Sequence, residues 1–600
     1  MQKRVLRHSF FVFYFMNFNF PNISFGFAFT LFVAAVLPWQ IAFYAVPIVS
    51  FFDEAAAFAG WAILLLVFGK YLAFVRLDRA TASVLSAIAL LALAGLAQFF
   101  AGKIVWAGQV AQLTYFLAAL ALVFWSGSQV KNPQTRLFVM DYWAWCWLLG
   151  CGLGFVTALI QYFGIEVSER IIAPLADKGR IFGNVHQPNQ FATLTALGLP
   201  CAVWLYQRCK LTLRTAGLMC AMIVLTVVLT SSRTGLVQLA WITAWILISK
   251  TASKRIATVV VWATIGAFGF LYYFDKAGVL PYFNSNRMTV TEVMAGNISN
   301  QRFQLWQDTW SLVLQNPWTG IGFGQFEFYR TFSDLPNDLK TIHVNAHLLP
   351  LQLAAEYGLP VAVVFFTLIG YALIQAKSAW RDPISQCAMA GVVIVLIHSS
   401  TEFPLWYAFI LLPFGFLLGL YFGGASSPNR STEATQVSVA LPKRAHKYAA
   451  LAMLGGIVLG TTHYLPTVAM YVLNTKDITR EDRLATAERA FLYKHWIVYN
   501  SIGGASYDEI SAQPKVLLPL FDKSSRFYMN EFNMAQYALV LAENGRYEHA
   551  TRVVAALRRL QSSKLPDLLM YCRSANTEGA SRLSSIIENQ VMPKLDARDF

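Results

Sequence analysis

The stretch "HVNAHLLPLQLAAEYGLPVAVVFFTLIG", residues 343–370, joins a polar segment with two histidines directly to an apolar run that ends without a charge. Similar apolar runs recur along the chain. Many are about 18 residues or longer, the length that crosses a hydrocarbon core of roughly 30 Å. The repetition of such runs predicts an all-α polytopic membrane protein.

Composition supports this prediction and limits the function classes. Of the 600 residues, 56% are hydrophobic and 13% are charged, whereas soluble domains carry about 25% charged residues. The net charge of +15 could suggest nucleic acid as a partner, but the basic residues lie in the connections between apolar runs, where they report topology. Six of the 7 cysteines lie in or beside apolar runs, which suits packing and predicts neither a disulfide framework nor a metal site.

The apolar runs predict about thirteen membrane spans. These are 24–44, 55–74, 82–101, 104–126, 137–163, 190–206, 215–230, 235–249, 256–273, 358–375, 384–402, 405–423 and 448–472. The even-numbered connections are basic, as with Lys250, Lys254 and Arg255, and the short odd-numbered ones are poor in basic residues. The positive-inside rule then places the N-terminus in the cytoplasm, and the odd connections and the C-terminal region outside.

This topology divides the chain into seven parts. They are a cytoplasmic lead-in (1–23), spans one to nine (24–273), a large outer loop (274–357), spans ten to twelve (358–423), a cytoplasmic loop (424–447), span thirteen (448–472) and an outer helical domain (473–600). In the last part, "FNMAQYALVLAENGRYEHATRVVAALRRL" has the spacing of one tetratricopeptide-like hairpin, and "EDRLATAERAF" could supply another helix. Such a domain could be a helical cap or a docking surface for a protein.

Three arginines stand out in the polar segments of the outer face. Arg180 lies in "GRIFGNVHQPNQFA", where Asn189 could simply cap a helix. Arg233 lies among hydroxyl residues in "SSRTGL"; it could extend to lipid headgroups, but a charge at a membrane edge favours a function. Arg302 opens a predicted amphipathic helix, 302–314, with its aromatic residues on one side.

Histidines and carboxylates complete the candidate site. His343 and His347 have the i, i+4 spacing that could place both on one helical face and bind a metal, but the Glu of H-E-x-x-H is missing. Glu356 continues the polar stripe from His347. His398 and Glu402 lie at the turn before span twelve, where Glu402 could position an arginine. The glycines of "GIGFG" lack the Lys of a phosphate loop, so we discount a nucleotide site.

These residue types suit one kind of chemistry. Arginine binds phosphate with two parallel hydrogen bonds and stays charged. Fixed guanidinium groups stabilise the negative charge that a diphosphate leaving group gains as its bond to a sugar breaks. A histidine can accept the proton of an attacking hydroxyl, and apolar spans can hold a lipid tail. The residues therefore indicate glycosyl transfer from a lipid diphosphate, with no metal and no cofactor.

Five motifs taken in order carry a family resemblance. They are "GRIFGNVHQPNQFA", "SSRTGL", "RFQLWQDTWSLVLQNPWTGIGFGQF", "NAHLLPLQLAAEYGL" and "HSSTEFPLWY". Over residues 25–425 the chain resembles the superfamily of O-antigen ligases and bacterial O-oligosaccharyltransferases, most of all the pilin-glycosylating branch. The resemblance implies that His347 is catalytic and that Arg233 and Arg302 bind the diphosphate. Arg180 and Asn189 occupy motif positions, and we expect Arg180 to bind the donor with the other two arginines and Asn189 to support the site. Leu348 stands where the family usually has Asn.

The resemblance also implies the reaction and its place. We expect transfer of a glycan from undecaprenyl diphosphate to Ser or Thr of a periplasmic protein such as a type IV pilin, with inversion at the anomeric carbon by analogy. The enzyme would lie among the lipids of the bacterial inner membrane with its active site facing the periplasm, and would have no nucleic-acid partner.

Three alternatives remain open. A ligase that transfers O-antigen to lipid A core would use the same chemistry on another acceptor. A lipid-glycan transporter would need paired charges inside the spans, which are nearly free of charge here. A non-catalytic membrane scaffold would retain function without His347.

Overall fold

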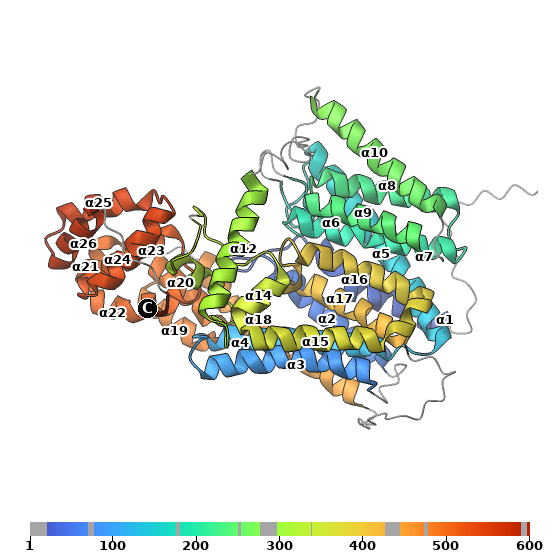
Figure 1. Ribbon diagram of the computed structural model, residues 1–600, viewed down its shortest axis with the longest axis horizontal. Coiled ribbons are helices and arrows are strands. Elements are labelled where there is room, and N and C mark those ends of the chain that lie inside the picture. Colours follow the sequence, from blue (N-terminus) through green and yellow to red (C-terminus); the bar gives the residue numbers. More distant parts are fainter. Residues whose placement is uncertain are drawn as a thin grey trace, which may run out of the picture.

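The computed structural model describes residues 21–69, 77–175, 180–249, 254–276, 297–337, 339–425, 444–472, 478–589 and 597–599. Over these residues the fold is all-helical, without strands (Figure 1). Most of the predicted lead-in, 1–23, and of the predicted cytoplasmic loop, 424–447, lies outside the described residues. The predicted all-α class is confirmed.

Each predicted span corresponds to helical structure. The helices are α1 (Pro21–Ala35), α2 (Phe51–Phe68), α3 (Arg79–Phe100), α4 (Ala107–Ser128), α5 (Pro133–Phe163), α6 (Pro188–Ala196), α7 (Gly198–Gln207), α8 (Leu213–Leu229), α9 (Arg233–Ile248), α10 (Lys254–Lys276), α15 (Leu359–Gln375), α16 (Pro383–Ser399), α17 (Ala408–Gly423) and α18 (Ala445–Val472). The span predicted at 190–206 is divided into α6 and α7. Pro200 lacks the N–H that would bond to the last carbonyl of α6, which accounts for the break.

The number of membrane crossings is less defined than the number of helices. Within the described ranges, 5 helices are long and apolar enough to cross a membrane by length and composition, namely α2, α3, α4, α5 and α18. Other apolar helices, such as α8, α9 and α15 to α17, are 10–17 residues long. The thirteen-span count, the orientation and the domain boundaries therefore stay predictions.

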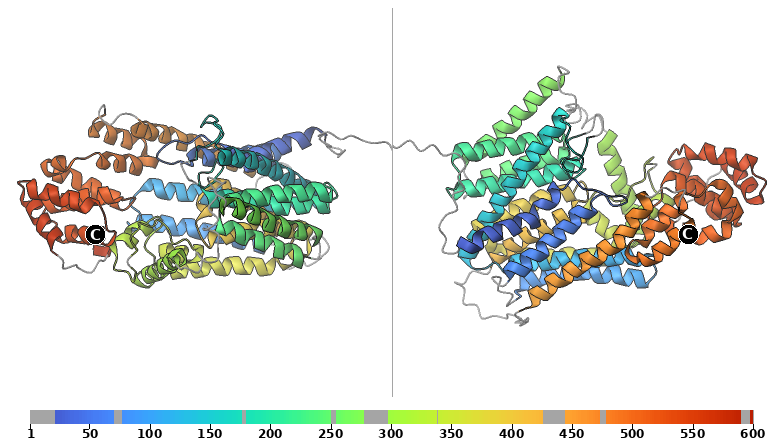
Figure 2. Two further views of the ribbon diagram at one scale, coloured as in Figure 1. Left: turned by 90° about the horizontal axis from the view of Figure 1, so that it is seen from above. Right: turned by 180° about the vertical axis from the view of Figure 1, so that it is seen from behind.

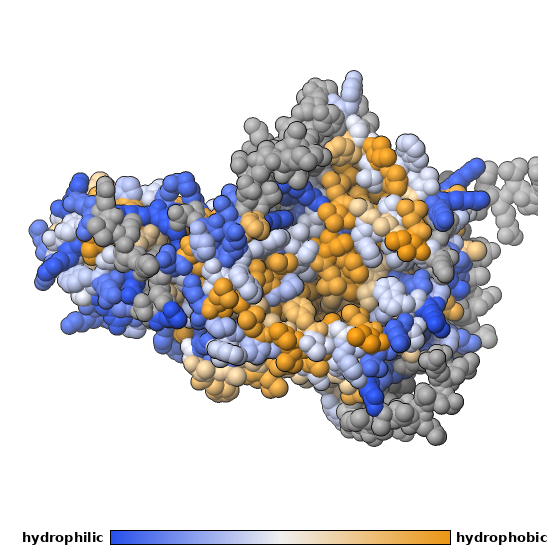
Figure 3. Space-filling model, viewed as in Figure 1, coloured by the Kyte–Doolittle hydropathy of each residue, from blue (hydrophilic) through white to orange (hydrophobic). Residues whose placement is uncertain are grey.

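Close helix packing holds the apolar part together. Helix α17 lies along α4, α15 lies along α3 (Figure 1), and α18 lies along α2 (Figure 2, right). Between α4 and α17, a Cβ added to Gly419 would come within 2.2 Å of the Phe124 carbonyl oxygen. Glycine at this crossing therefore allows the two backbones to approach, as in many membrane helix pairs. Hydrophobic side chains cover this part, whereas hydrophilic ones dominate the C-terminal helices (Figure 3).

The C-terminal region is a compact set of short helices. They are α19 (Arg480–Arg489), α20 (Lys494–Gly503), α21 (Tyr507–Ala512), α22 (Pro514–Ser525), α23 (Glu531–Glu543), α24 (Tyr547–Arg559), α25 (Lys564–Ser574) and α26 (Glu578–Glu588). The predicted hairpin is present as the packed pair α23 and α24, and "EDRLATAERAF" forms α19. The likeness to tetratricopeptide repeats stays a prediction.

These C-terminal helices pack on the predicted large loop, which forms α12 (Asn297–Gln315), α13 (Phe326–Phe332) and α14 (Leu349–Tyr357). Phe328 and Phe332 of α13 belong to the apolar core of the C-terminal region. Arg559 donates to the carbonyl oxygens of Arg330, Thr331 and Ser333. The loop and the C-terminal helices are therefore one packed unit at the end of the bundle where the candidate site lies (Figure 1).

Candidate functional site

The carboxylate of Glu402 brings together side chains from three segments of the chain, 187–189, the start of α12 and its own segment 398–402. Its Oε1 accepts a hydrogen bond of 2.6 Å from Asn189 Nδ2, and its Oε2 accepts one of 2.6 Å from Gln187 Nε2. Nη2 of Arg302 lies 3.8 Å from Oε1, and Nε2 of His398 lies 3.5 Å from Oε2. We call these five residues the Glu402 cluster. The structure thus unites four of the predicted site residues.

The charge of Glu402 is held by these neighbours. Burial favours the neutral carboxyl, but the hydrogen bond and charge of His398 and the hydrogen bond from Asn189 lower the pKa of Glu402. Glu402 is therefore an anion at neutral pH, in an environment that supplies compensating positive charge.

Arg180 holds the frame of the cluster. It donates to the carbonyl oxygens of Thr230 and Ser231 at 3.0 and 3.1 Å, and to Asn189 Oδ1 at 3.1 Å. Ser232 donates to the same Asn189 oxygen at 2.7 Å and also caps the N-terminus of α9. These contacts tie Arg180 to Asn189 and the 230–232 turn, and its role in donor binding stays a prediction.

Arg233 and Arg302 place two positive charges beside the cluster. Arg233 is the first residue of α9, so its charge adds to the positive end of the helix dipole. Burial lowers the pKa of Arg302. The negative charge of Glu402 raises this pKa, whereas the positive charge of Arg233 lowers it further. Two guanidinium groups that affect each other's charge, one of them at the N-terminus of α9, form a site suited to an anion with more than one charge.

The loop that carries His347 has a strained backbone, which hydrogen bonds to the side chains of Asn345 and Gln352 fix in place. His347 has φ 54°, a left-handed conformation that side chains rarely adopt. Its backbone N–H donates to Asn345 Oδ1 at 2.8 Å, and the N–H of Ala346 donates to Gln352 Oε1 at 2.7 Å. Among the described non-glycine residues, Ser231 and His186 share this conformation near the same site. Such strain gathers where the structure fixes functional side chains.

The environment of His347 keeps the imidazole neutral. Burial lowers the pKa of His347, and the charge of Arg302 lowers it further. The charge of Glu402 and a hydrogen bond with the Thr401 backbone raise this pKa, but the net effect is a lowering. The ring packs edge-on against Phe403, with centroids 5.6 Å apart. A neutral imidazole can accept a proton near neutral pH.

His398 contacts Glu402 from the interior of the helix bundle. Its Nδ1 lies 2.9 Å from Thr193 Oγ1, which also receives a hydrogen bond of 2.8 Å from Gln238 Nε2. Because His398 is fully buried, this network fixes the ring and presents Nε2 to Glu402. His398 is therefore a positioning residue.

Glu356, predicted as a supporting residue, lies elsewhere. Its Oε1 accepts the Gly324 N–H at 2.8 Å, and its carbonyl oxygen accepts from Gln98 Nε2 at 2.7 Å. A Cβ at Gly320 would lie 2.3 Å from the Glu356 carbonyl oxygen, and Gly320 has φ 63°. The "GIGFG" segment thus uses glycine for a close approach of two backbones, and Glu356 holds that segment.

The predicted helical face for His343 and His347 is wrong. Residues 343–347 form a loop, and α14 begins only at Leu349. The extended backbone of Leu348 and the proline near the start of α14 fix this boundary. The two rings lie 6.3 Å apart and perpendicular. The described residues hold no group of three or more His, Cys, Asp or Glu arranged to bind a metal.

Sequence analysis missed a buried ion pair that anchors the loop. Asp308 of α12 lies 3.4 Å from Nη2 of Arg330, and Arg330 donates to the Thr341 carbonyl at 3.0 Å. Asp308 lies between Leu305 and Leu312 on the buried face of α12. A charged residue within this apolar stripe is the sequence feature that could have predicted a buried ion pair. On the aromatic side predicted for this helix, Phe303 and Trp310 are 59% and 48% exposed.

Comparisons with known families cover the site segments. Residues 218–366 match the O-antigen ligase model, residues 181–206 match the protein glycosylation ligase model, and residues 386–562 match the C-terminal part of a virulence factor membrane-bound polymerase. These ranges contain Arg233, Arg302, His347 and Glu402. The resemblance to the superfamily of O-antigen ligases and O-oligosaccharyltransferases is confirmed.

Two curated relatives come from Acinetobacter baylyi. A general O-oligosaccharyltransferase is 25% identical over 416 residues, covering 67% of this chain and 70% of the relative. A ComP-specific O-oligosaccharyltransferase is 24% identical over 492 residues, covering 80% of this chain and 81% of the relative. No solved structure matches the chain.

Proposed function

For a chain of the O-antigen ligase and O-oligosaccharyltransferase superfamily, we propose O-linked protein glycosylation. The enzyme moves a glycan en bloc from undecaprenyl diphosphate to Ser or Thr of a periplasmic protein such as a type IV pilin. The coarse activity, transfer of a glycan to a protein, is supported by the protein glycosylation ligase match and by both relatives. The donor and the pilin-like acceptor follow from the resemblance of the motifs.

One observation carries the proposal: the Arg302–Glu402 ion pair lies beside His347, with Arg233 close enough to affect Arg302. In this arrangement the two arginines, which can bind a doubly charged anion, lie beside the neutral imidazole of His347, which can act as a base. The N-terminus of α9 adds partial positive charge to the same place. A hydroxyl that enters beside His347 would meet a sugar whose diphosphate is bound by the arginines.

In the proposed step, the acceptor oxygen attacks the anomeric carbon of the donor sugar. The bond from that carbon to the diphosphate oxygen breaks, and its electron pair leaves with the lipid diphosphate. His347 accepts the hydroxyl proton and later releases it to solvent. Arg233 and Arg302 stabilise the charge that the diphosphate gains, an effect that grows as water is excluded.

A second acceptor class has support of its own. The match over residues 218–366 is to an O-antigen ligase, so transfer of an O-polysaccharide to lipid A core is the alternative. Both activities would use the same donor site and base. Only the acceptor distinguishes them.

The test is reconstitution of the purified chain with an undecaprenyl-diphosphate-linked glycan and either a pilin or lipid A core. Intact mass of the acceptor reads the product. We expect a mass increase of one glycan on the pilin, loss of transfer in His347→Ala, and retention in His343→Ala, the matched control on the same loop. Full transfer in His347→Ala would remove the base from the proposal, and transfer to lipid A core alone would favour the ligase.

A further inference from the structure

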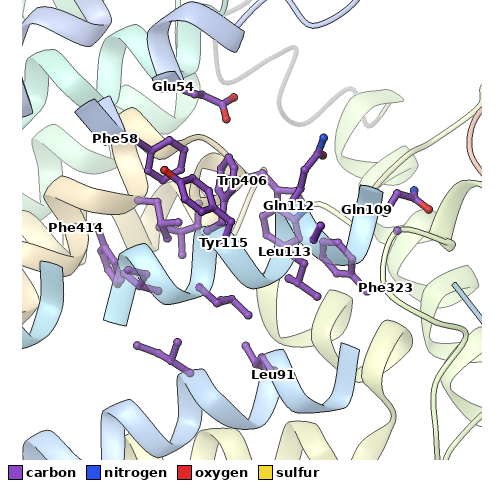
Figure 4. A pocket seen from close by; sticks show the side chains of 18 of the residues that line it. Glu54, Phe58, Leu91, Gln109, Gln112, Leu113, Tyr115, Phe323, Trp406 and Phe414 are labelled. Carbon is purple, nitrogen blue, oxygen red and sulfur yellow. The ribbon is translucent and has the colours of Figure 1, made fainter. Parts of the chain in front are cut away.

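A large cavity lies beside the candidate site, between the helices and the C-terminal region. Its volume is about 880 Å³, within the range of ligand-binding pockets. Helices α2, α3, α4, α15, α16 and α17 line most of it, and Tyr493, His495 and Phe527 contribute from the C-terminal region. Glu54, Gln109 and Gln112 lie along one side, and Leu91 and Phe414 lie on the other (Figure 4). The cavity is therefore apolar with one polar side.

The cavity opens toward the apolar surface between two consecutive helices. Helix α15 packs on α3 while α16 packs on α17, and the cavity is lined from both α15 and α16. Phe366 and Leu373 of α15 and Leu396 of α16 all line it, and they are 38%, 37% and 41% exposed. A hydrocarbon chain can thus enter from the bilayer without crossing polar surface.

The polar side of the cavity contains buried atoms without partners. Within the described part of the chain, Gln109 Oε1, Glu356 Oε2 and His495 Nδ1 are buried and have no hydrogen-bond partner. Glu356 and His495 are each 2% exposed. Leaving such groups unpaired is costly. All three line the cavity, so a ligand there would satisfy them.

The charges of the lining determine which ligand fits. Two carboxyl groups, Glu54 and Glu356, line the cavity, and its lining includes no Arg or Lys. This is the opposite of the Arg233 and Arg302 site, so a diphosphate is disfavoured here. Carboxyl and amide oxygens require a ligand that donates hydrogen bonds. An ammonium group donates three and carries the complementary charge.

We propose that this cavity binds a bilayer lipid with a primary ammonium headgroup, at a site separate from that of the glycan donor. The hydrocarbon chain lies among the apolar residues of α15, α16 and α17, and the ammonium lies at Gln109 and Glu356, whose side chains both approach Gly324. Burial raises the pKa of Glu356 to about 8, so the bound cation also favours ionisation of that carboxyl.

The bound lipid would also support the candidate site. Trp406 lines the cavity, its ring centroid lies 6.4 Å from that of Phe403, and Phe403 packs on His347. The occupant thus fills the space behind the ring that contacts the catalytic histidine. Binding can be measured without glycosyl transfer, so failure of this inference and failure of the proposed function are distinguishable.

The test uses the full chain in nanodiscs of dioleoyl phosphatidylcholine with one diazirine-tailed probe at a time. The probes are phosphatidylethanolamine, phosphatidylcholine and phosphatidylglycerol with identical chains. They differ in charge and in N–H donors. We expect phosphatidylethanolamine to label peptides of α15, α16 and α17 most strongly. Equal labelling by the three probes would overturn the ammonium assignment, and displacement of the label by undecaprenyl diphosphate would assign the cavity to the donor instead.

Two kinds of variant sharpen the test. Glu356→Gln should lower labelling by the phosphatidylethanolamine probe roughly tenfold, as expected for loss of a charge-assisted hydrogen bond. Asp53→Asn is the matched control, since Asp53 is a buried carboxyl on α2 outside the lining. Leu396→Trp should block the opening and reduce labelling by all three probes. Unchanged labelling in Leu396→Trp would refute lateral entry, and unchanged labelling in Glu356→Gln would refute the headgroup site.

Discussion

Nη2 of Arg302 lies 3.8 Å from Oε1 of Glu402. This ion pair connects the N-terminal part of α12 to the turn between α16 and α17. The pair is partly open, with the two side chains 35% and 16% exposed. A diphosphate would compete with Glu402 for this guanidinium. We infer that Glu402 holds Arg302 in place until the donor arrives.

Replacing Glu402 should shift the pH dependence of transfer. The charge of Glu402 raises the pKa of His347 against the larger effect of burial. In Glu402→Gln this charge is absent, so the pKa of His347 falls further and its neutral form persists to lower pH. The acid limb of the kcat/KM profile should move to lower pH. Glu488→Gln, an exposed carboxylate of α19, should leave the limb in place; a limb that moves upward in Glu402→Gln would contradict the assignment.

Arg302 should be sensitive even to lysine. Arginine binds a diphosphate with two parallel N–H groups, and lysine offers a single ammonium. We expect Arg302→Ala to lower kcat about 100-fold or more, as for loss of one preorganised donor to a developing anion, and Arg302→Lys to recover only part. Steady-state kinetics with lipid-linked glycan provide the measurement. Arg170→Ala, at an exposed arginine between α5 and α6, serves as control and should behave as wild type.

The buried pair Asp308 and Arg330 should separate stability from activity. Both side chains are at most 1% exposed, so Asp308→Asn leaves an uncompensated charge and should cost about 3–5 kcal/mol. The double variant Asp308→Leu, Arg330→Met should regain much of that stability. It should not regain full kcat, because Arg330 also holds the Thr341 carbonyl ahead of His347. Thermal unfolding and initial rates test this, and full activity in the double variant would rule out a positioning role.

Arg559 should affect catalysis from the C-terminal region. Its guanidinium binds three carbonyls at the C-terminal end of α13, and α13 carries Arg330. Arg559→Leu should lower kcat several-fold with little change in KM for the donor. Arg573→Leu, which breaks only an exposed pair with Glu588, is the control. Equal effects of the two variants would indicate a nonspecific cause.

Deletion of the whole C-terminal region is a poorer experiment. Phe328 and Phe332 are buried in its core, so removing it would expose apolar surface on the catalytic loop. Loss of activity after deletion would then report a damaged site as much as a lost acceptor surface.

Acidification should loosen the junction of the C-terminal region with the bundle. Burial lowers the pKa of His495 to about 3, whereas an unfolded histidine titrates near 6.5. Between these values the unfolded state binds the extra proton, so stability is lost as the pH falls from about 6.5 towards 3. His495→Gln should flatten this dependence in thermal unfolding scans. The same slope in variant and wild type would exclude His495 as its source.

Composition and local pattern were enough to predict the class of this protein. The apolar runs gave every helix of the bundle, since burial in a bilayer requires long runs that satisfy their own backbone. Local sequence pattern failed to predict two features of the backbone. The i, i+4 spacing of His343 and His347 suggested a helix, but Leu348 is extended and α14 starts after it. The span at 190–206 looked continuous, but it is broken ahead of Pro200.

The sequence by itself determined the helical membrane class and the residue types of the site, because hydrophobic runs and motif order are properties of short segments. Only the tertiary structure decided which side chains meet. Glu402 joins Gln187, Asn189 and Arg302, while Glu356 turns to Gly324 and away from that cluster. Hydrogen bonds between distant segments depend on which helix ends pack together, and that packing is set by the bundle as a whole.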